Sequence, residues 1–202
     1  RRVLFRSSAV SPGAVSFTNV VSGDEVTASA SLVSTSLSTG GQIKAGSYQQ
    51  RVSAIGGTDA GNYSLSSSYT TPTATYTVSQ LALTGTAIAS ASSTYGSAVS
   101  PGAVSFTNVV SGDEVTASAS LVGTSLSTGG QIKAGSYQQR VSAIGGTDAG
   151  NYSLSSYTTP TATYTVNQLA LVGALSAGSS VYGATLAPGT VSLSNVVSGD
   201  QV

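Results

Sequence analysis

Residues 11–33 read SPGAVSFTNVVSGDEVTASASLV, and the same 23 letters return at residues 100–122, an offset of 89 positions. The identity continues with QIKAGSYQQRVSAIGGTDAGNYSLSS from Gln42 and from Gln131, and it resumes one residue shorter with YTTPTATYTV. This period is too long for the rung of a β-solenoid or the unit of an ankyrin array. It therefore predicts one small domain per copy.

A third copy opens with VYG at residues 181–183, and its Pro188 stands 87 positions after Pro101. We divide the chain into a first repeat at 8–84 that lacks its start, a complete second repeat at 85–172, and the start of a third repeat at 173–202. A domain of this size buries roughly 60–65% of the surface of its unfolded chain. We therefore expect modest stability and support from neighbouring repeats.

Apolar and polar residues alternate through several short segments of the second repeat, as in half-buried strands. The residues expected to face inward are Val104, Phe106, Val115, Ala117, Ala119, Leu121, Ile132, Ala134, Val141, Ala143, Tyr152, Leu154, Ala162, Tyr164 and Val166. Turns rich in Gly, Pro, Asp and Asn separate these segments. The fold class predicted is all-β, with tandem immunoglobulin-like β-sandwich repeats of about 88 residues. Leu169 and Leu171 fall out of phase with Val166, which indicates a bulge or a strand that leaves one repeat and enters the next.

The first seven residues, RRVLFRS, hold three of the five arginines of the chain. They match the translation of the sequencing-adapter string AGACGTGTGCTCTTCCGATCT, so residues 1–7 are interpreted as an adapter-like scar and excluded from the fold prediction. Without them the formal charge falls from 0 to −3. Because no basic patch and no long apolar run remains, we expect neither nucleic acid as a partner nor a membrane span in this chain.

The chain contains no cysteine and no histidine. Their absence removes disulfides, thiolate nucleophiles, the commonest general base and the commonest zinc ligands. Serine is abundant, but a serine nucleophile would lack its usual base. The sequence therefore predicts a protein that is not an enzyme and that has no catalytic residue, no cofactor and no metal site.

The segment TDAGNYSL at residues 58–65, repeated at 147–154, resembles the DAGNY signature of the YDG and MBG repeats of bacterial haemagglutinin-like exoproteins. Further matching segments are TYG at 94–96, VYG at 181–183, VSGDEV at 110–115 and YTV at 164–166. Both Tyr-Gly segments lack the Asp that gives the YDG repeat its name. The likeness covers essentially all of residues 8–202.

The resemblance implies a stalk, because such repeats are strung along giant bacterial adhesins of the two-partner or autotransporter kind. The implied function is a non-catalytic structural spacer of a large surface or secreted adhesin. Its place would be outside a Gram-negative bacterium or on the cell surface. The implied partners are neighbouring repeats of the same chain, with the host surface or matrix reached through another part of the protein.

Two turns offer residues of types that bind ions. GGTDAG at residues 56–61 is rich in glycine like a phosphate cradle, but a strand is expected after it, so we interpret it as a β-turn. Acids could bind calcium in each repeat: Asp24, Glu25 and Asp59 in the first, and Asp113, Glu114 and Asp148 in the second. They are too few for a typical calcium loop, and solvated turns are predicted instead.

Lysine and tyrosine positions recur with the repeat. Lys44 or Lys133 could form an isopeptide bond with Asn62 or Asn151, but strand alternation predicts that Lys133 faces solvent while Ile132 and Ala134 face inward. The recurring tyrosine pairs are Tyr48/Tyr137, Tyr63/Tyr152 and Tyr76/Tyr164, which we interpret as packing residues. An exposed tyrosine patch would instead favour the alternative function, a module that recognises host glycans or surface proteins.

Overall fold

The computed structural model describes residues 10–202, so the adapter-like segment at 1–7 lies outside the described residues. The chain is all-β, as the sequence predicts, with two three-residue 3-10 turns, η1 (Ala60–Asn62) and η2 (Ala149–Asn151). The strands up to the second repeat's start are β1 (Thr27–Leu32), β2 (Gly46–Tyr48), β3 (Gln50–Gly56), β4 (Tyr69–Thr70), β5 (Tyr76–Val78) and β6 (Leu81–Ala82). The later strands are β7 (Ala87–Ile88), β8 (Ala91–Thr94), β9 (Val104–Ser105), β10 (Ser120–Val122), β11 (Gly135–Val141), β12 (Tyr152–Ser153), β13 (Tyr157–Thr158), β14 (Tyr164–Asn167), β15 (Gly173–Leu175) and β16 (Val191–Leu193).

The chain forms two compact units, each assembled from three segments. Unit 1 contains the described residues up to Gly85 together with Phe106–Thr116 and Ile144–Ser155. Unit 2 contains Thr86–Ser105, Ala117–Ala143 and Ser156–Val202. The border between the units therefore runs through the second sequence repeat, because two of its turn regions pack with the first repeat.

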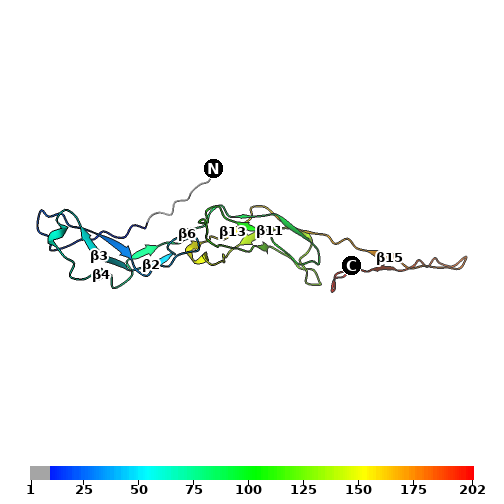
Figure 1. The fold of residues 1–202 in the computed structure, drawn as a ribbon. Coiled ribbons are helices and arrows are strands. Elements are labelled where there is room, and N and C mark those ends of the chain that lie inside the picture. The colour runs from blue at the N-terminus through cyan, green and yellow to red at the C-terminus, as the bar shows by residue number, and fades with distance from the viewer. Residues whose placement is uncertain (1–9) are drawn as a thin grey trace. The chain divides into compact units, whose positions relative to one another are not determined.

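Unit 1 is built on the antiparallel sheet β1-β3-β4, beside the pair β2-β5 (Figure 1). In β1, the sequence TASASL alternates exposed and half-buried residues, so its alanines and Leu32 face inward. The register between β1 and β3 shifts between Ala28 and Ala30, and Ala30 lies opposite Val52. Strand β6 leaves the first repeat and pairs in parallel with β12 of the second, Leu81 opposite Tyr152.

Unit 2 is organised around β11, which pairs with β10, β13 and β14 (Figure 1). Strand β8 adds to this sheet in parallel with β14, Ala91 lying opposite Tyr164. Strand β7 pairs with β9, Ile88 opposite Val104. Strands β15 and β16 form a separate two-stranded hairpin in the third repeat.

The core of unit 2 is a cluster of Tyr137, Tyr164 and Val166. The hydroxyls of both tyrosines have partners: Tyr137 donates to the carbonyl of Lys133 at 2.6 Å, and Tyr164 accepts from the amide of Ser100 at 3.2 Å. Tyr48 is buried in unit 1, and Tyr63 and Tyr76 are half-buried. The recurring tyrosines are therefore packing residues, as predicted, with each buried ring placing its polar end on a backbone group.

Three alanines were expected to face inward, and this expectation is wrong. Ala134, Ala143 and Ala162 are exposed because each lies just outside a strand, in the segments that flank β11 and β14. The alternation elsewhere is confirmed: Val115, Ala117, Ala119 and Leu121 are half-buried, with exposed residues between them. Period-two patterns thus identified the strands but extended them beyond their ends.

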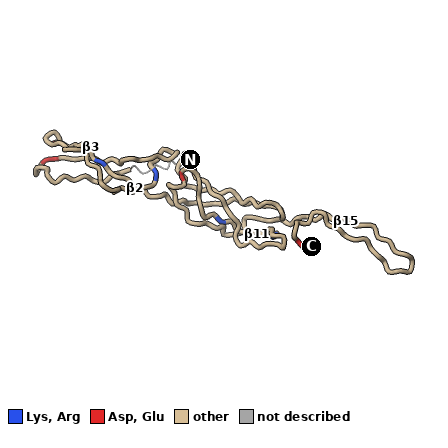
Figure 2. The backbone as a smooth tube through the Cα atoms, turned by 90° about the horizontal axis from the view of Figure 1, so that it is seen from below, with Lys and Arg blue, Asp and Glu red and all other residues tan. Residues whose placement is uncertain are grey.

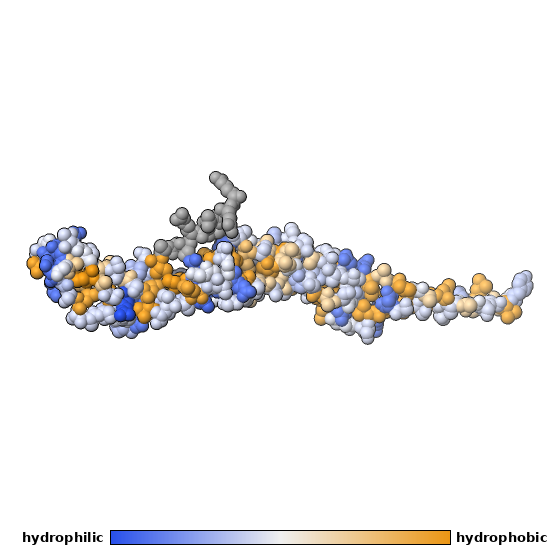
Figure 3. All heavy atoms as spheres, in the orientation of Figure 1, coloured by the Kyte–Doolittle hydropathy of each residue, from blue (hydrophilic) through white to orange (hydrophobic). Residues whose placement is uncertain are grey.

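Charged residues are sparse along the described backbone (Figure 2). Apolar and polar residues are interspersed over the face seen in Figure 3. Within residues 10–202, no helix has the length and apolar character that crossing a membrane requires.

Candidate functional site

Many of the polar contacts that join one repeat to the next come from three short turns, and others link Ala82 and Thr84 to Asn108. We name them by sequence: the SGD turn (residues 22–24, 111–113 and 198–200), the DAGN turn (59–62 and 148–151) and the STGG turn (38–41 and 127–130). Because all three recur with the repeat, a contact between them can be repeated along the chain.

Within a repeat, the DAGN turn is tied to the residue that follows the SGD turn. The Asp148 carboxylate accepts from the amide of Glu114 (2.9 Å), and the Asp148 amide donates to the Glu114 carbonyl (3.1 Å). Asp59 and Glu25 make the same two bonds in the first repeat. Gly146, with φ of 97°, lets the chains approach, since a Cβ there would lie 2.4 Å from the Glu114 carbonyl oxygen. The aspartate therefore acts as a turn-closing group.

A tyrosine hydroxyl adds a second link between the same turns. Tyr152 donates to Asp113 Oδ2 at 2.7 Å and accepts from the amide of Val110 at 3.0 Å. Tyr63 makes the matching pair of bonds in the first repeat. Burial and the hydrogen bond to Asp113 raise the pKa of Tyr152 to about 12, because both disfavour the phenolate.

Within unit 1, the STGG turn of the first repeat contacts both turns of the second. The Thr39 amide donates to Asp148 Oδ1 at 3.2 Å. The one proton of the Thr39 hydroxyl is shared between two acceptors, Asp148 Oδ2 and, at 2.8 Å, the carbonyl of Gly112. The Gly40 amide donates to Asp113 Oδ1 at 2.9 Å. Asp148 is 1% exposed, and the hydrogen bond from Thr39, followed by that from the Glu114 amide, lowers its pKa. Two carboxylates of one repeat are thus partly satisfied by donors of another.

Two further bonds complete this contact in unit 1. The Ala45 amide donates to the side-chain oxygen of Asn151 at 2.9 Å, and the Gln80 side chain donates to the Gly150 carbonyl at 2.9 Å. Next to them, β6 lies in parallel against β12. The DAGN turn of the second repeat is therefore held from two sides by the first repeat.

Glycine is required on both sides of the contact. A Cβ on Gly40 would lie 2.5 Å from Asp113 Oδ1 and 2.8 Å from the Ser111 carbonyl oxygen. Gly112 has a φ of 93°, and a Cβ there would lie 2.9 Å from the Gly40 Cα. Both clashes involve backbone or a hydrogen-bonded carboxylate, so a larger residue at either position would separate the turns.

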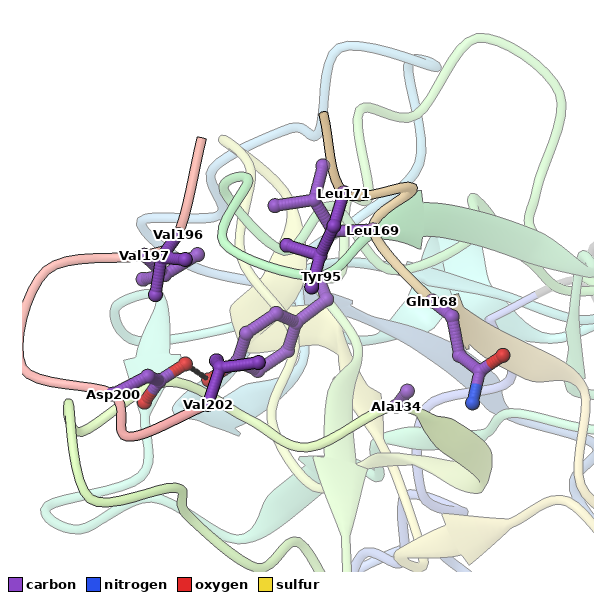
Figure 4. A pocket seen from close by; sticks show the side chains of 9 residues that line it. All are labelled: Tyr95, Ala134, Gln168, Leu169, Leu171, Val196, Val197, Asp200 and Val202. Atoms are coloured by element: carbon purple, nitrogen blue, oxygen red, sulfur yellow. Dashed lines mark hydrogen bonds between the residues drawn. The ribbon is translucent and has the colours of Figure 1, made fainter. Parts of the chain in front are cut away.

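The same contact recurs in unit 2, where the STGG turn of the second repeat meets the SGD turn of the third. The Gly129 amide donates to Asp200 Oδ1 at 2.9 Å. A Cβ on Gly129 would lie 2.6 Å from the Ser198 carbonyl oxygen, and one on Gly199 would lie 2.9 Å from the Gly129 Cα. The second oxygen of Asp200 accepts from the Tyr95 hydroxyl, which lowers the pKa of Asp200 and raises that of Tyr95 (Figure 4).

An apolar cavity of about 430 Å³ lies beside this contact in unit 2 (Figure 4). Its walls include Leu169 and Leu171, which precede β15, and Val196 and Val197 of the third repeat. The out-of-phase leucines therefore belong to the segment through which the chain leaves the second repeat. In unit 1 the corresponding segment contains β6, which leaves the first repeat and pairs with β12 of the second. Leu169 and Leu171 themselves lie outside any strand, so the passing strand is found at Leu81 and not at the residues for which it was expected.

Within residues 10–202, no group of three His, Cys, Asp or Glu residues is placed to hold one metal ion. The oxygens of Asp113 and Asp148 instead accept from amides and hydroxyls of the chain itself. The DAGN segment forms a single 3-10 turn, too short to bind a phosphate through a helix terminus.

The lysine pairings predicted as an alternative find no support in the described contacts. Lys133 is exposed, as predicted, and Lys44 is half-buried. The side-chain oxygen of Asn151 is occupied by the Ala45 amide.

Sequence reasoning identified the SGD and DAGN turns but not the STGG turn as their partner. The Gly129-Gly130 pair indicates a turn, yet nothing local shows which segment it meets, since Gly40 and Asp113 are 73 residues apart. The available signal was joint recurrence: the turns return together at the repeat period.

Comparisons of the chain with protein-family models, with curated proteins and with solved structures gave no match.

Proposed function

We propose that this chain is a non-catalytic structural spacer from a large bacterial surface or secreted adhesin, built from tandem immunoglobulin-like β-sandwich repeats. The observation that carries the proposal is the contact between SGD and STGG turns, made twice with corresponding residues. Gly40 donates to Asp113 and Gly129 donates to Asp200, each at 2.9 Å. A contact that recurs with the sequence period can join any number of repeats by one local geometry, as a stalk requires.

The use of reactive and charged side chains supports the same function. Asp113, Asp148 and Tyr152 are engaged within the turns, and the chain has no histidine or cysteine to add to them. Groups already committed to closing turns are poor candidates for binding a substrate. The partners of the stalk are its neighbouring repeats, and the host surface or matrix is reached through another part of the adhesin.

Binding and calorimetry test the spacer. The full chain is passed over arrays of glycans and immobilised matrix proteins, and its thermal unfolding is recorded with calcium and with a chelator. We expect cooperative unfolding, no saturable binding and no calcium-dependent rise in melting temperature. Saturable binding to one glycan or matrix protein would contradict the spacer and favour the adhesive module.

Two matched variants test whether the contact between the turns stabilises the chain. Thr39→Ala removes hydroxyl bonds to Asp148 and to the Gly112 carbonyl, and it should cost about 1–3 kcal/mol of unfolding free energy in urea. Thr128 occupies the same place in the second STGG turn, is exposed, and makes no side-chain hydrogen bond within the described residues. Thr128→Ala should therefore cost less than about 0.5 kcal/mol. Equal losses would show that the contact between repeats contributes nothing.

The alternative, a module that binds glycans through tyrosines, requires those rings on the surface. Tyr137, Tyr152 and Tyr164 are 8%, 3% and 0% exposed, respectively. The burial of the recurring tyrosines therefore supports the spacer over a tyrosine-based binding patch.

A further inference from the structure

The strands through which the chain enters and leaves the second repeat lie side by side and run in the same direction. The chain enters this repeat through residues 86–94, which end in β8, and it leaves the repeat after β14. Strand β8 pairs in parallel with β14, Ala91 lying opposite Tyr164 and Thr94 opposite Asn167. Both strands belong to unit 2. The entry and the exit of the complete repeat are therefore joined by one ladder of backbone hydrogen bonds.

The direction of this pairing decides how tension along the chain loads the ladder. In a parallel pair, the start of one strand and the end of the other lie at opposite ends of the ladder. A pull on the chain before β8 and after β14 therefore moves the two strands in opposite directions along their own axes, and all the bonds between them are stretched together. In an antiparallel pair the same two points lie at one end of the ladder, and the bonds open one after another.

Hydrogen bonds hold this ladder from one end to the other. The Ala91 amide donates to the Thr163 carbonyl at 3.1 Å, and the Tyr95 amide donates to the Asn167 carbonyl at 2.8 Å. The Asn167 side chain also donates to the Ser93 carbonyl at 3.3 Å. Sliding one strand past the other therefore breaks backbone and side-chain bonds in the same step.

The chain just before the ladder is anchored separately. The Ala89 amide donates to the Ala103 carbonyl at 2.9 Å, and the Ala89 carbonyl accepts from the side-chain nitrogen of Gln139 at 2.9 Å. Gln139 is fully buried, and its side-chain oxygen accepts from the Gly102 amide at 2.7 Å. Bonds to a buried side chain are shielded from water that would otherwise compete for them. Gln139 therefore shares the tension that reaches β8.

The apolar core of unit 2 lies against the same ladder. Ala91 and Tyr95 pack on the cluster of Tyr137, Tyr164 and Val166, and Tyr164 and Val166 are 0% and 3% exposed. Displacing β8 along β14 uncovers these side chains. The displacement therefore costs apolar burial as well as hydrogen bonds.

The segment between two repeats is held by an asparagine of the repeat that follows it. In unit 1, the Thr84 amide donates to the Asn108 side-chain oxygen at 2.9 Å, and the Asn108 side-chain nitrogen donates to the Ala82 carbonyl at 2.8 Å. In unit 2, Asn195 makes the corresponding two bonds, both at 2.7 Å. The asparagine amide thus takes the place of a neighbouring strand. Tension therefore reaches each repeat through a segment whose backbone is already bonded.

We propose that β8 and β14 form a mechanical clamp, which keeps the second repeat folded under tension because the whole ladder must break in one step. The source of the tension rests on the proposed function, since a stalk that links two surfaces is pulled along its length. The resistance itself follows from the parallel pairing of the entry and exit strands and can be measured on the chain alone.

Pulling single molecules of the full chain from two pairs of points tests the clamp. The chain has no cysteine, so two introduced cysteines are the only attachment points. Ser90→Cys with Gln168→Cys pulls at opposite ends of the ladder, whereas Ser97→Cys with Gln168→Cys pulls at the same end, and all three residues are exposed. At equal force, the opposite-end pair should hold at least about tenfold longer than the same-end pair, because it loads all the bonds together. Equal lifetimes, or a longer lifetime for the same-end pair, would overturn the proposal.

Two matched proline variants show whether the ladder is the element that yields. The amides of Ala91 and Tyr95 face β14, so strand alternation places the Ser93 amide on the same side. The Ser92 amide then faces the edge of the sheet, which has no further strand within residues 10–202. Ser93→Pro should shorten the lifetime of the opposite-end pair by at least about tenfold, whereas Ser92→Pro should change it by less than about threefold.

Equal effects of the two prolines would refute the clamp, because the repeat would then yield at another place. Circular dichroism checks that each variant folds, and if Ser93→Pro does not fold, the comparison of attachment points decides alone. None of these outcomes alters the test of the spacer, which measures binding and thermal unfolding without force.

Discussion

In the turns of this protein, single side chains serve as hydrogen-bond partners of backbone groups. Asp148 accepts from two amides and a hydroxyl, and Tyr152 accepts from an amide while donating to Asp113. Such bonds to a charged group are stronger than neutral ones, and they become costly when one partner changes its protonation state. Ionisation of the turn residues should therefore change the free energy of unfolding as the pH changes.

Tyr152 predicts a loss of stability at alkaline pH. Its pKa is about 12 in the folded chain against about 10 in an unfolded one, so the folded state holds the proton more tightly. The resulting stabilisation is complete below pH 10 and is lost as the pH rises from about 10 to about 12. Urea unfolding across this range should show the decline, and Tyr152→Phe should flatten it. Tyr69→Phe, at a ring that is 59% exposed, should leave the slope unchanged, and equal slopes in both variants would refute the assignment.

At the scale of strands, the close approach of residues 86–94 to Gly102 gives a sharp prediction. Gly102→Ala places a methyl group where the Ala89 carbonyl lies, so the strand must move, and the cost should be about 1–3 kcal/mol or more. Gly13→Ala makes the same change in the first repeat, where the nearest atoms among residues 10–202 belong to the Gln50 side chain, at 3.4 Å, and it should cost less than about 0.5 kcal/mol. Urea unfolding of the two variants measures the difference, and equal costs would contradict the tighter backbone contact at Gly102.

The same strands show what the sequence could and could not predict. Alternation revealed β1, β10 and β14 because one face of each strand is apolar. The parallel pairs β6-β12 and β8-β14 were not predicted, because they join residues about 70 positions apart and no local pattern specifies a partner. The contact of the STGG turn was missed for the same reason. Composition correctly predicted an all-β chain, whereas partner choice depends on non-local packing.

At the scale of the whole chain, sequence repeats and compact units do not coincide. Unit 1 includes Phe106–Thr116 and Ile144–Ser155 of the second repeat, so part of that repeat contributes to the stability of the first. In repeat proteins, stability is divided between each repeat and its contacts with neighbours. A substitution in the turns of one repeat should therefore lower the local stability of the repeat before it.

Asp148→Asn tests this coupling through hydrogen exchange. The amides of Thr39, Gly40 and Ala45 donate to the second repeat, and the neutral side chain would weaken the hold on them. A loss of about 1.5–3 kcal/mol corresponds to exchange faster by roughly ten- to a hundredfold at these amides. Asp59→Asn is the matched control, because Asp59 closes the same turn in the first repeat but makes no side-chain bond to another repeat within residues 10–202. It should accelerate exchange at Glu25 while leaving the amides of Thr39 and Gly40 protected. If both variants accelerated exchange at the same amides, breaking a turn inside the first repeat would expose them as readily as weakening the contact between the repeats. The turn contact would then not be what couples the two repeats.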